Sequence, residues 1–200
     1  MNNYDVIIIG GGVSGLSCAI TLGSAHTKVE AASNKSILVI DEGKSHLNMA
    51  ELYNVAGVEE GTKGPELLKS LAKKAIKYDG VSLQRGEVQK VSGKIGAFTV
   101  YTQDQELKAS LIVFATGMQT IEVEGIGAGV VEHIRAPRPE MVMIENNNGI
   151  ISDGKYVTGC AAGATSMYSS AAGYGAQTAT DIISFWAGKY TVIHDVLKKD

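Results

Sequence analysis

A glycine-rich segment near the start of the sequence constrains the fold more than any other feature. Residues 5–9 read Asp-Val-Ile-Ile-Ile, a short apolar and β-branched run, and residues 10–15 follow at once with Gly-Gly-Gly-Val-Ser-Gly. Leu-Ser-Cys-Ala-Ile comes next and favours a helix. The pattern therefore predicts a buried strand, a tight turn and the start of a helix.

Three glycines in this segment have the spacing G-x-G-x-x-G, and each has a physical task. Gly10 allows the sharp turn, Gly12 allows the backbone to approach a diphosphate, and Gly15 allows the helix to pack closely on the sheet. The free N–H groups and the positive end of the helix dipole favour an anion there. The flanking strand and helix favour nucleotide binding over the alternative, a purely structural glycine turn.

Acidic residues stand where the next strand ends. Residues 36–40 form a second buried run and lead into Asp41 and Glu42, whose carboxylates could accept hydrogen bonds from ribose hydroxyl groups. Asp41 is the first candidate and Glu42 the second. Asp41 follows Gly15 by 26 residues, more than the usual ~20, and the polar residues 28–35 account for the difference as an insertion. The alternative is that these acids merely open a solvated loop.

Composition excludes several classes of function. The chain of 200 residues has a net charge of −3, and its 18 Lys and Arg residues are scattered, so we expect no nucleic-acid partner. No apolar run reaches ~18 residues and no leader precedes the first strand, so we expect a cytoplasmic protein without a membrane partner. Cys18 and Cys160 form no C-x-x-C, and the four histidines lack ligand spacing, so we expect no metal site.

The remaining pattern indicates an α/β fold. Residues 44–64 read as a loop, and Pro65 opens an amphipathic helix. Residues 81–91 look extended, residues 97–102 alternate like an edge strand, and residues 107–115 form a core strand, which together predict a small antiparallel β-meander. A second glycine-rich stretch at residues 125–129 follows no apolar strand, and we expect a loop there.

The last part of the sequence predicts a strand and a long helix. A turn at residues 152–154 precedes a short strand at residues 156–159, and residues 164–186 form a helical pattern rich in small residues that contains Gly173 and Gly175. The whole predicts a Rossmann-like three-layer fold with a parallel sheet, in one domain over residues 1–200. Its first part covers residues 1–117, and residues 150–200 supply a returning strand and helix.

Four ordered motifs carry a family resemblance. They lie at residues 5–15, 37–43, 114–117 (Phe-Ala-Thr-Gly) and 156–175, and together they resemble the FAD-binding domain of thioredoxin reductase-like flavoproteins, in the two-dinucleotide-fold oxidoreductase superfamily. The resemblance implies FAD as the cofactor and a set of residues that hold it. The implied diphosphate ligands are Gly10, Gly12, Val13, Ser14 and Gly15, and the implied ribose ligands are Asp41, Glu42, Gly43 and Lys44. The resemblance also implies that Val88 contacts adenine and that Asn54 lies in the loop beside the flavin. The other residues of the implied site are Asn48, Thr116, Gly117, Gly159, Cys160, Met167 and Tyr168.

The sequence departs from this family at three places. Only about 40 residues separate Gly117 from Gly159, where the family inserts an NAD(P)H-binding domain, and the C-x-x-C of that domain is also missing. The family's Gly-Asp at the flavin ribitol is replaced by Gly159-Cys160, and its Arg-Gln-Ala resembles residues 166–168, Ser-Met-Tyr. Cys160 is therefore either a structural replacement or a catalytic candidate, whose pKa the following helix would lower if the sulfur faced it.

Three functions are consistent with these features. The first is a small oxidoreductase that passes electrons between an external donor, either weakly bound NAD(P)H or a partner protein, and a small-molecule or protein acceptor. The second is a non-catalytic FAD-binding module, such as an assembly subunit or a redox sensor. The third is an ordinary NAD-binding Rossmann protein, which leaves the Ala-Thr-Gly motif unexplained. We expect a homodimer or a partner chain to replace the missing nicotinamide domain.

Overall fold

The computed structural model describes residues 3–197 and is built around a parallel sheet. Five strands of this sheet are mutually parallel, and a sixth pairs antiparallel at one edge. In spatial order the strands are β11 (Ile150–Ser152), β12 (Lys155–Val157), β8 (Glu106–Phe114), β1 (Asn3–Ile9), β2 (Ile37–Asp41) and β5 (Val81–Arg85).

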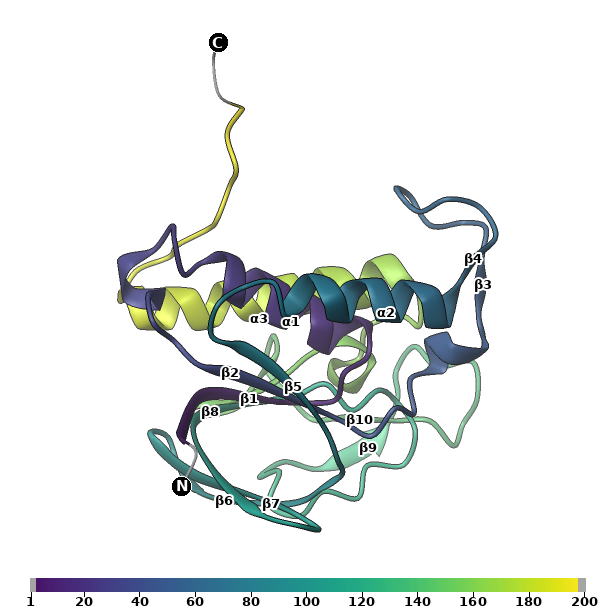
Figure 1. Ribbon diagram of the computed structural model, residues 1–200. Coiled ribbons are helices and arrows are strands. Elements are labelled where there is room, and N and C mark those ends of the chain that lie inside the picture. The colour runs from purple at the N-terminus through teal and green to yellow at the C-terminus, as the bar shows by residue number, and fades with distance from the viewer. Residues whose placement is uncertain (1–2, 198–200) are drawn as a thin grey trace.

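Three layers are visible in Figure 1, as the sequence predicts. The helices α1 (Val13–Ser24), α2 (Gly64–Ala75) and α3 (Tyr168–Ala187) cover one face of the parallel sheet, and β6 (Val88–Lys94) and β7 (Ala97–Thr102) lie on its other side. Successive side chains of β1 point to opposite faces of the sheet, and both sets are buried. Val6 and Ile8 pack on the helix side, and Ile7 and Ile9 pack on the side of β6 and β7.

The strand β8 joins the parallel sheet to the antiparallel meander. Its first residues pair with β7 and its later residues pair with β12, while it pairs with β1 along most of its length. The prediction of an edge strand at residues 97–102 is wrong, because β7 pairs with both β6 and β8. Buried Thr99 lies on the opposite face of the strand from buried Phe98 and Val100, so neither face of β7 is open to solvent at these residues.

Other boundaries differ from the sequence prediction. Residues 81–91 divide into β5 and β6, since residues 86–87 interrupt the extended run. The predicted loop at residues 44–64 contains a 3-10 turn, η2 (His46–Met49), and the short antiparallel pair β3 (Glu51–Leu52) and β4 (Thr62–Lys63). The last helix begins at Tyr168 rather than residue 164, because a 3-10 turn, η3 (Gly159–Ala162), and a short connection precede it.

The helices α1 and α3 pack in close contact. A side chain on Gly175 would overlap the carbonyl oxygen of Ser14, and the Ser17 hydroxyl donates a 2.7 Å hydrogen bond to the carbonyl of Ala172. In the turn before α3, a side chain on Gly159 would overlap the Ser14 side chain. The small residues of α3 therefore allow the end of the fold to pack against its beginning.

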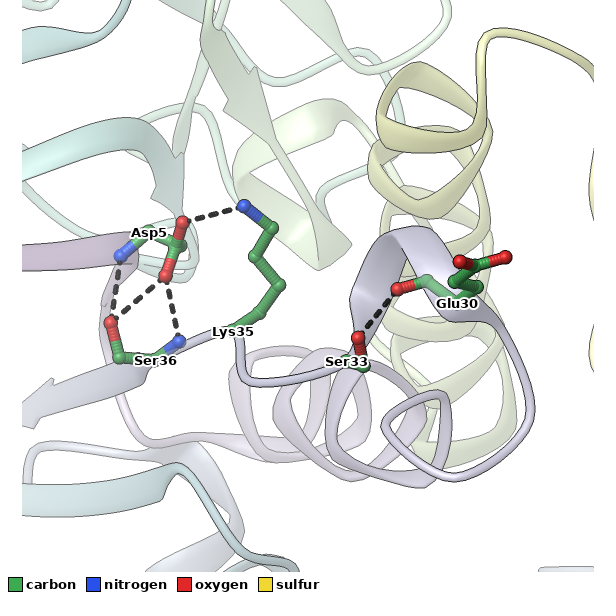
Figure 2. A network of polar contacts seen from close by, with 5 residues as sticks. All are labelled: Asp5, Glu30, Ser33, Lys35 and Ser36. Carbon is green, nitrogen blue, oxygen red and sulfur yellow. Dashed lines mark hydrogen bonds and ion pairs between the residues drawn. The ribbon is translucent and has the colours of Figure 1, made fainter.

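A polar network fixes the amino ends of β1 and β2 (Figure 2). The carboxylate of Asp5 accepts hydrogen bonds from Lys35 Nζ at 2.9 Å, from the Ser36 N–H at 2.9 Å and from the Ser36 hydroxyl at 3.1 Å. Burial alone would raise the pKa of Asp5, but the hydrogen bonds from Ser36 and Lys35 outweigh it and lower that pKa. Residues 28–35, interpreted from sequence as an insertion, thus end in this anchor.

Candidate functional site

The glycine-rich segment forms the strand, turn and helix that the sequence predicts. Gly10 has a φ of +112°, and a Cβ there would overlap the carbonyl of Ala115, so only glycine suits this position. Gly12 is the N-cap of α1, and no side chain among residues 3–197 caps the helix. The Leu16 N–H bonds to the Gly12 carbonyl at 2.9 Å, so the N–H groups of residues 13–15 have no acceptor within the helix. This helix end can receive an anion.

A cavity of about 1110 Å³ lies along the carboxyl ends of the parallel strands, beside this helix end. Its lining comes from segments far apart in the sequence, including the turn after β1, the loop after β2, the start of β6, the turn after β8 and the start of α3. Fourteen of the residues implied by the resemblance line it: Gly10, Gly12, Val13, Ser14, Asp41, Glu42, Lys44, Asn54, Val88, Thr116, Gly117, Cys160, Met167 and Tyr168.

Four of the expected residues do not line this cavity. Gly15 is buried against the Gly10 carbonyl, and Gly159 packs on Ser14, so both shape the site from behind. Gly43 and Asn48 line a second, smaller cavity of about 260 Å³. Their contact is structural, since Asn48 Nδ2 donates to the Gly43 carbonyl at 2.9 Å.

Both acidic candidates line the large cavity, with different partners. Asp41 Oδ1 accepts the N–H groups of Gly11 at 3.2 Å and Gly43 at 3.0 Å, and its Oδ2 lies 3.9 Å from Arg85 Nη1. Glu42 Oε2 lies 2.7 Å from Lys44 Nζ, and this hydrogen bond raises the pKa of Lys44. Asp41 therefore holds the glycine turn in place in addition to facing the cavity.

The other end of the cavity is formed by the turns after β8 and β12. The Thr116 hydroxyl is buried there without a hydrogen-bond partner among residues 3–197. The thiol of Cys160 is partly buried, and burial raises its pKa, although a hydrogen bond with the Ser166 side chain opposes this. The sequence prediction of a lowered pKa applied only if the sulfur faced the helix start, and here desolvation of the sulfur dominates and raises the pKa of Cys160 instead. Cys160 is mainly a neutral thiol at pH 7.

A short hairpin lies in the stretch between Gly117 and Gly159, ahead of β11 and β12. Its strands are β9 (Val130–Glu132) and β10 (Val142–Ile144), and residues 125–129 form a loop as predicted. Residues before β9 and between β9 and β10 complete the cavity wall, and no sequence motif singles them out because they lie in connections without a periodic pattern. They include Gln119, Thr120, Glu122, Arg138, Glu140 and Met141.

Hydrogen bonds fix this hairpin to the turn that carries Cys160. The buried His133 accepts the Arg135 N–H on Nδ1 at 3.0 Å, so its Nε2 carries the proton and donates to the Cys160 carbonyl at 2.9 Å. Arg135 Nη1 donates to the Gly163 carbonyl at 2.9 Å. These contacts thus stabilise the turn that carries Cys160.

Neither a metal-binding cluster nor a membrane-spanning helix occurs in the part of the chain that is described. Within residues 3–197, no group of His, Cys, Asp and Glu side chains is arranged to hold a metal ion. Over the same residues, no helix has both the length and the apolar character needed to span a bilayer.

Known proteins with similar sequences include thioredoxin reductases. Over 113 residues the chain is 29% identical to NADPH-dependent thioredoxin reductase 3 of Arabidopsis thaliana, which covers 56% of this chain and 21% of that protein. Over 114 residues it is 28% identical to the thioredoxin reductase of Mycolicibacterium smegmatis, covering 57% of this chain and 35% of that protein. The matched part is thus about a fifth to a third of these relatives' lengths.

Solved structures share the fold. A thioredoxin reductase from Gloeobacter violaceus superposes with a TM-score of 0.77 at 14% identity, covering 99% of this chain and 100% of that chain. An oxidoreductase from Agrobacterium tumefaciens gives a TM-score of 0.74 at 16% identity, covering 92% and 99%. The family model described as pyridine nucleotide-disulphide oxidoreductase matches residues 4–140. With more than half of its length matched, and with the fold of these reductases, the chain belongs to the pyridine nucleotide-disulphide oxidoreductase family.

Proposed function

We propose that the protein binds FAD in the large cavity and acts as a small FAD-dependent oxidoreductase. The observation that carries this proposal is the continuous cavity from the uncapped start of α1 to the start of α3, lined by fourteen of the residues that the family resemblance implies. Its volume of about 1110 Å³ suits a large ligand, since most small-molecule sites measure ~300–1,000 Å³.

The residues present fit this cofactor. The open side of Gly12 and the free N–H groups of α1 suit a diphosphate, while Asp41 or Glu42 and the start of β6 suit an adenosine. The unpartnered Thr116 hydroxyl offers a hydrogen bond at the other end, beside Cys160 and Tyr168. A buried hydroxyl without a partner is costly in a folded protein, so a bound ligand is a reasonable partner for it.

The chain's own contribution is binding and electrostatics. When bound, the flavin supplies the capacity to accept and release electrons. Within the described part of the chain, the N-terminus of α3 has no side-chain cap and its first turn has no acid, and Met167 and Tyr168 of this end line the cavity. The helix dipole therefore stabilises negative charge at this end of the site.

The electron donor and acceptor are proposed to be separate molecules. The hairpin of β9 and β10 lies in the stretch where the family resemblance implies a nicotinamide domain. In addition, no C-x-x-C motif occurs in the sequence. We therefore propose NAD(P)H as a weakly bound reductant, or a partner chain or a second copy that supplies the missing part. We place the reaction in the cytoplasm.

The absence of a reactive thiol pair also favours a second candidate, a non-catalytic FAD-binding module. Anaerobic titration with NADH, NADPH and dithiothreitol, monitored at the flavin absorbance bands, distinguishes the two. Bleaching, followed by recovery when an acceptor is added, supports the oxidoreductase. A yellow protein that no donor bleaches supports the module, and a colourless protein that takes up no FAD overturns both.

A further inference from the structure

We propose that the Ser45 hydroxyl donates a hydrogen bond to the diphosphate of the cofactor from its position beside Gly12, next to the start of α1. The inference rests on the proposed function, since it assigns a residue to the bound FAD. No sequence motif singles out Ser45, because a serine in a polar loop carries none.

The position of Ser45 relative to Gly12 is the first observation. A Cβ on Gly12 would lie 3.5 Å from Ser45 Oγ and 3.9 Å from Ser45 Cβ, and Ser45 is the one residue beyond the adjoining backbone that comes within 4 Å in the described chain. Both residues line the large cavity. Ser45 is thus the side chain facing the space that the glycine leaves open beside the start of α1.

The hydrogen bonding of Ser45 is the second observation. Ser45 is the N-cap of η2, and its Oγ accepts the Leu47 N–H at 3.3 Å. A hydroxyl has one proton to donate and two acceptor positions. This contact uses one acceptor position and fixes the oxygen, while the proton has no acceptor among residues 3–197. It is free to turn toward an anion in the cavity.

The neighbouring charges explain why a neutral donor matters at this place. Lys44 is the adjacent cation, but its Nζ is paired with Glu42 at 2.7 Å and its side chain is 66% exposed. The helix end offers backbone N–H groups from one direction only. The Ser45 hydroxyl beside Gly12 adds a side-chain donor from the loop after β2, and hydrogen bonds to charged groups are stronger than neutral ones. The pair Gly12 and Ser45 then selects ligands that contain a diphosphate.

Binding of ADP and adenosine to the apoprotein tests this assignment without relying on activity. For Ser45→Ala we expect about 10-fold weaker binding of ADP and FAD, as for the loss of one hydrogen bond to a charged group, and unchanged binding of adenosine. Ser33→Ala is the matched control, because Ser33 also hydrogen bonds at a 3-10 turn, to the Glu30 carbonyl at 2.7 Å, but lies outside the cavity lining.

Ser45→Asp separates the ligand contact from the capping role. Aspartate caps as well as serine, so the melting temperature of the apoprotein should stay close to that of the wild type, while ADP binding should fall by about 100-fold or more through charge repulsion. If Ser45→Ala leaves ADP binding unchanged, or weakens ADP and adenosine equally, the assignment is wrong although the protein binds FAD. If the wild type binds neither ADP nor FAD, the proposed function itself fails.

Discussion

Gly15 lies directly against the carbonyl group of Gly10, with no room for a side chain between them. Gly12, three residues earlier, has a φ of −75°, and a methyl group there would meet its neighbours only at ordinary contact distances. The first and last glycines of the motif therefore serve the fold, whereas the middle glycine leaves space for a ligand.

This difference predicts opposite results for two alanine variants. Gly15→Ala should lower the free energy of unfolding by about 1–3 kcal/mol, because the added methyl overpacks the turn. Gly12→Ala should unfold at nearly the wild-type temperature but retain less FAD, and Gly12→Asp should retain none, since its charge repels the diphosphate. Thermal unfolding and flavin content measure the two effects. Stoichiometric flavin in purified Gly12→Asp would refute the phosphate-site assignment.

For Cys160 we predict a structural role. Burial raises the pKa of its thiol, so the nucleophilic thiolate is scarce at pH 7. Cys160→Ser should retain FAD and most activity, and Cys160→Asp, which restores the family's carboxylate, should bind FAD at least as well as the wild type. Flavin content and steady-state turnover of both variants check this.

A specific result would make Cys160 a catalytic residue instead. That result is loss of turnover in Cys160→Ser with an unchanged flavin content. Cys18 is the internal control, because it is fully buried on α1 and burial raises its pKa further; its alkylation in the native protein should be slower than that of Cys160.

Reduction by nicotinamide nucleotides should be weak. The stretch between Gly117 and Gly159 holds a hairpin with three-residue strands, which offers no second dinucleotide fold. Stopped-flow reduction should therefore show little discrimination between NADH and NADPH and no saturation in the micromolar range. Tight, saturable NADPH binding by this chain would contradict the prediction.

The Asp5 network predicts a stability difference that depends on pH. The folded pKa of Asp5 is lowered relative to an unfolded value near ~3.9, so its contribution is full above that pH and disappears as the pH falls through the folded pKa. Asp5→Asn should lower the free energy of unfolding by about 1–2 kcal/mol at pH 7, and the difference should shrink below about pH 4. Urea unfolding at several pH values measures it, with Asp104→Asn in the exposed turn after β7 as the control. An equal loss at pH 3 and pH 7 would contradict this account.

Sequence reasoning was most successful where a periodic pattern coincides with a turn signal. The segment from β1 into α1, the strand ending at Asp41 and the amphipathic helix after Pro65 all combine apolar periodicity with a glycine, acidic or proline boundary. The β9 and β10 strands are too short to show a period, and β7 looked like an edge strand because its interior position depends on pairing with distant β8.

Within the site, local motifs indicated which residues face the cavity, but not their partners. The hydrogen bonds of Asp41 to Gly11 and Gly43, and the contact of His133 with the Cys160 carbonyl, join segments whose proximity follows only from the assembled fold. The proximity of Ser45 to Gly12 belongs to the same class, since it also follows only from the assembled fold.

The packing of α3 on α1 also determines when the cavity can form while the chain is being synthesised. Residues 5–15 leave the ribosome early, but Ser14 lacks its packing partners until Gly159 and Gly175 have emerged. Until then the nascent chain can pair β1, β2 and β5, yet its phosphate turn has neither the wall of α3 nor the turn that carries Cys160. The nascent chain therefore lacks the complete cavity, and the proposed binding of FAD has to wait until the last long helix has folded against the first.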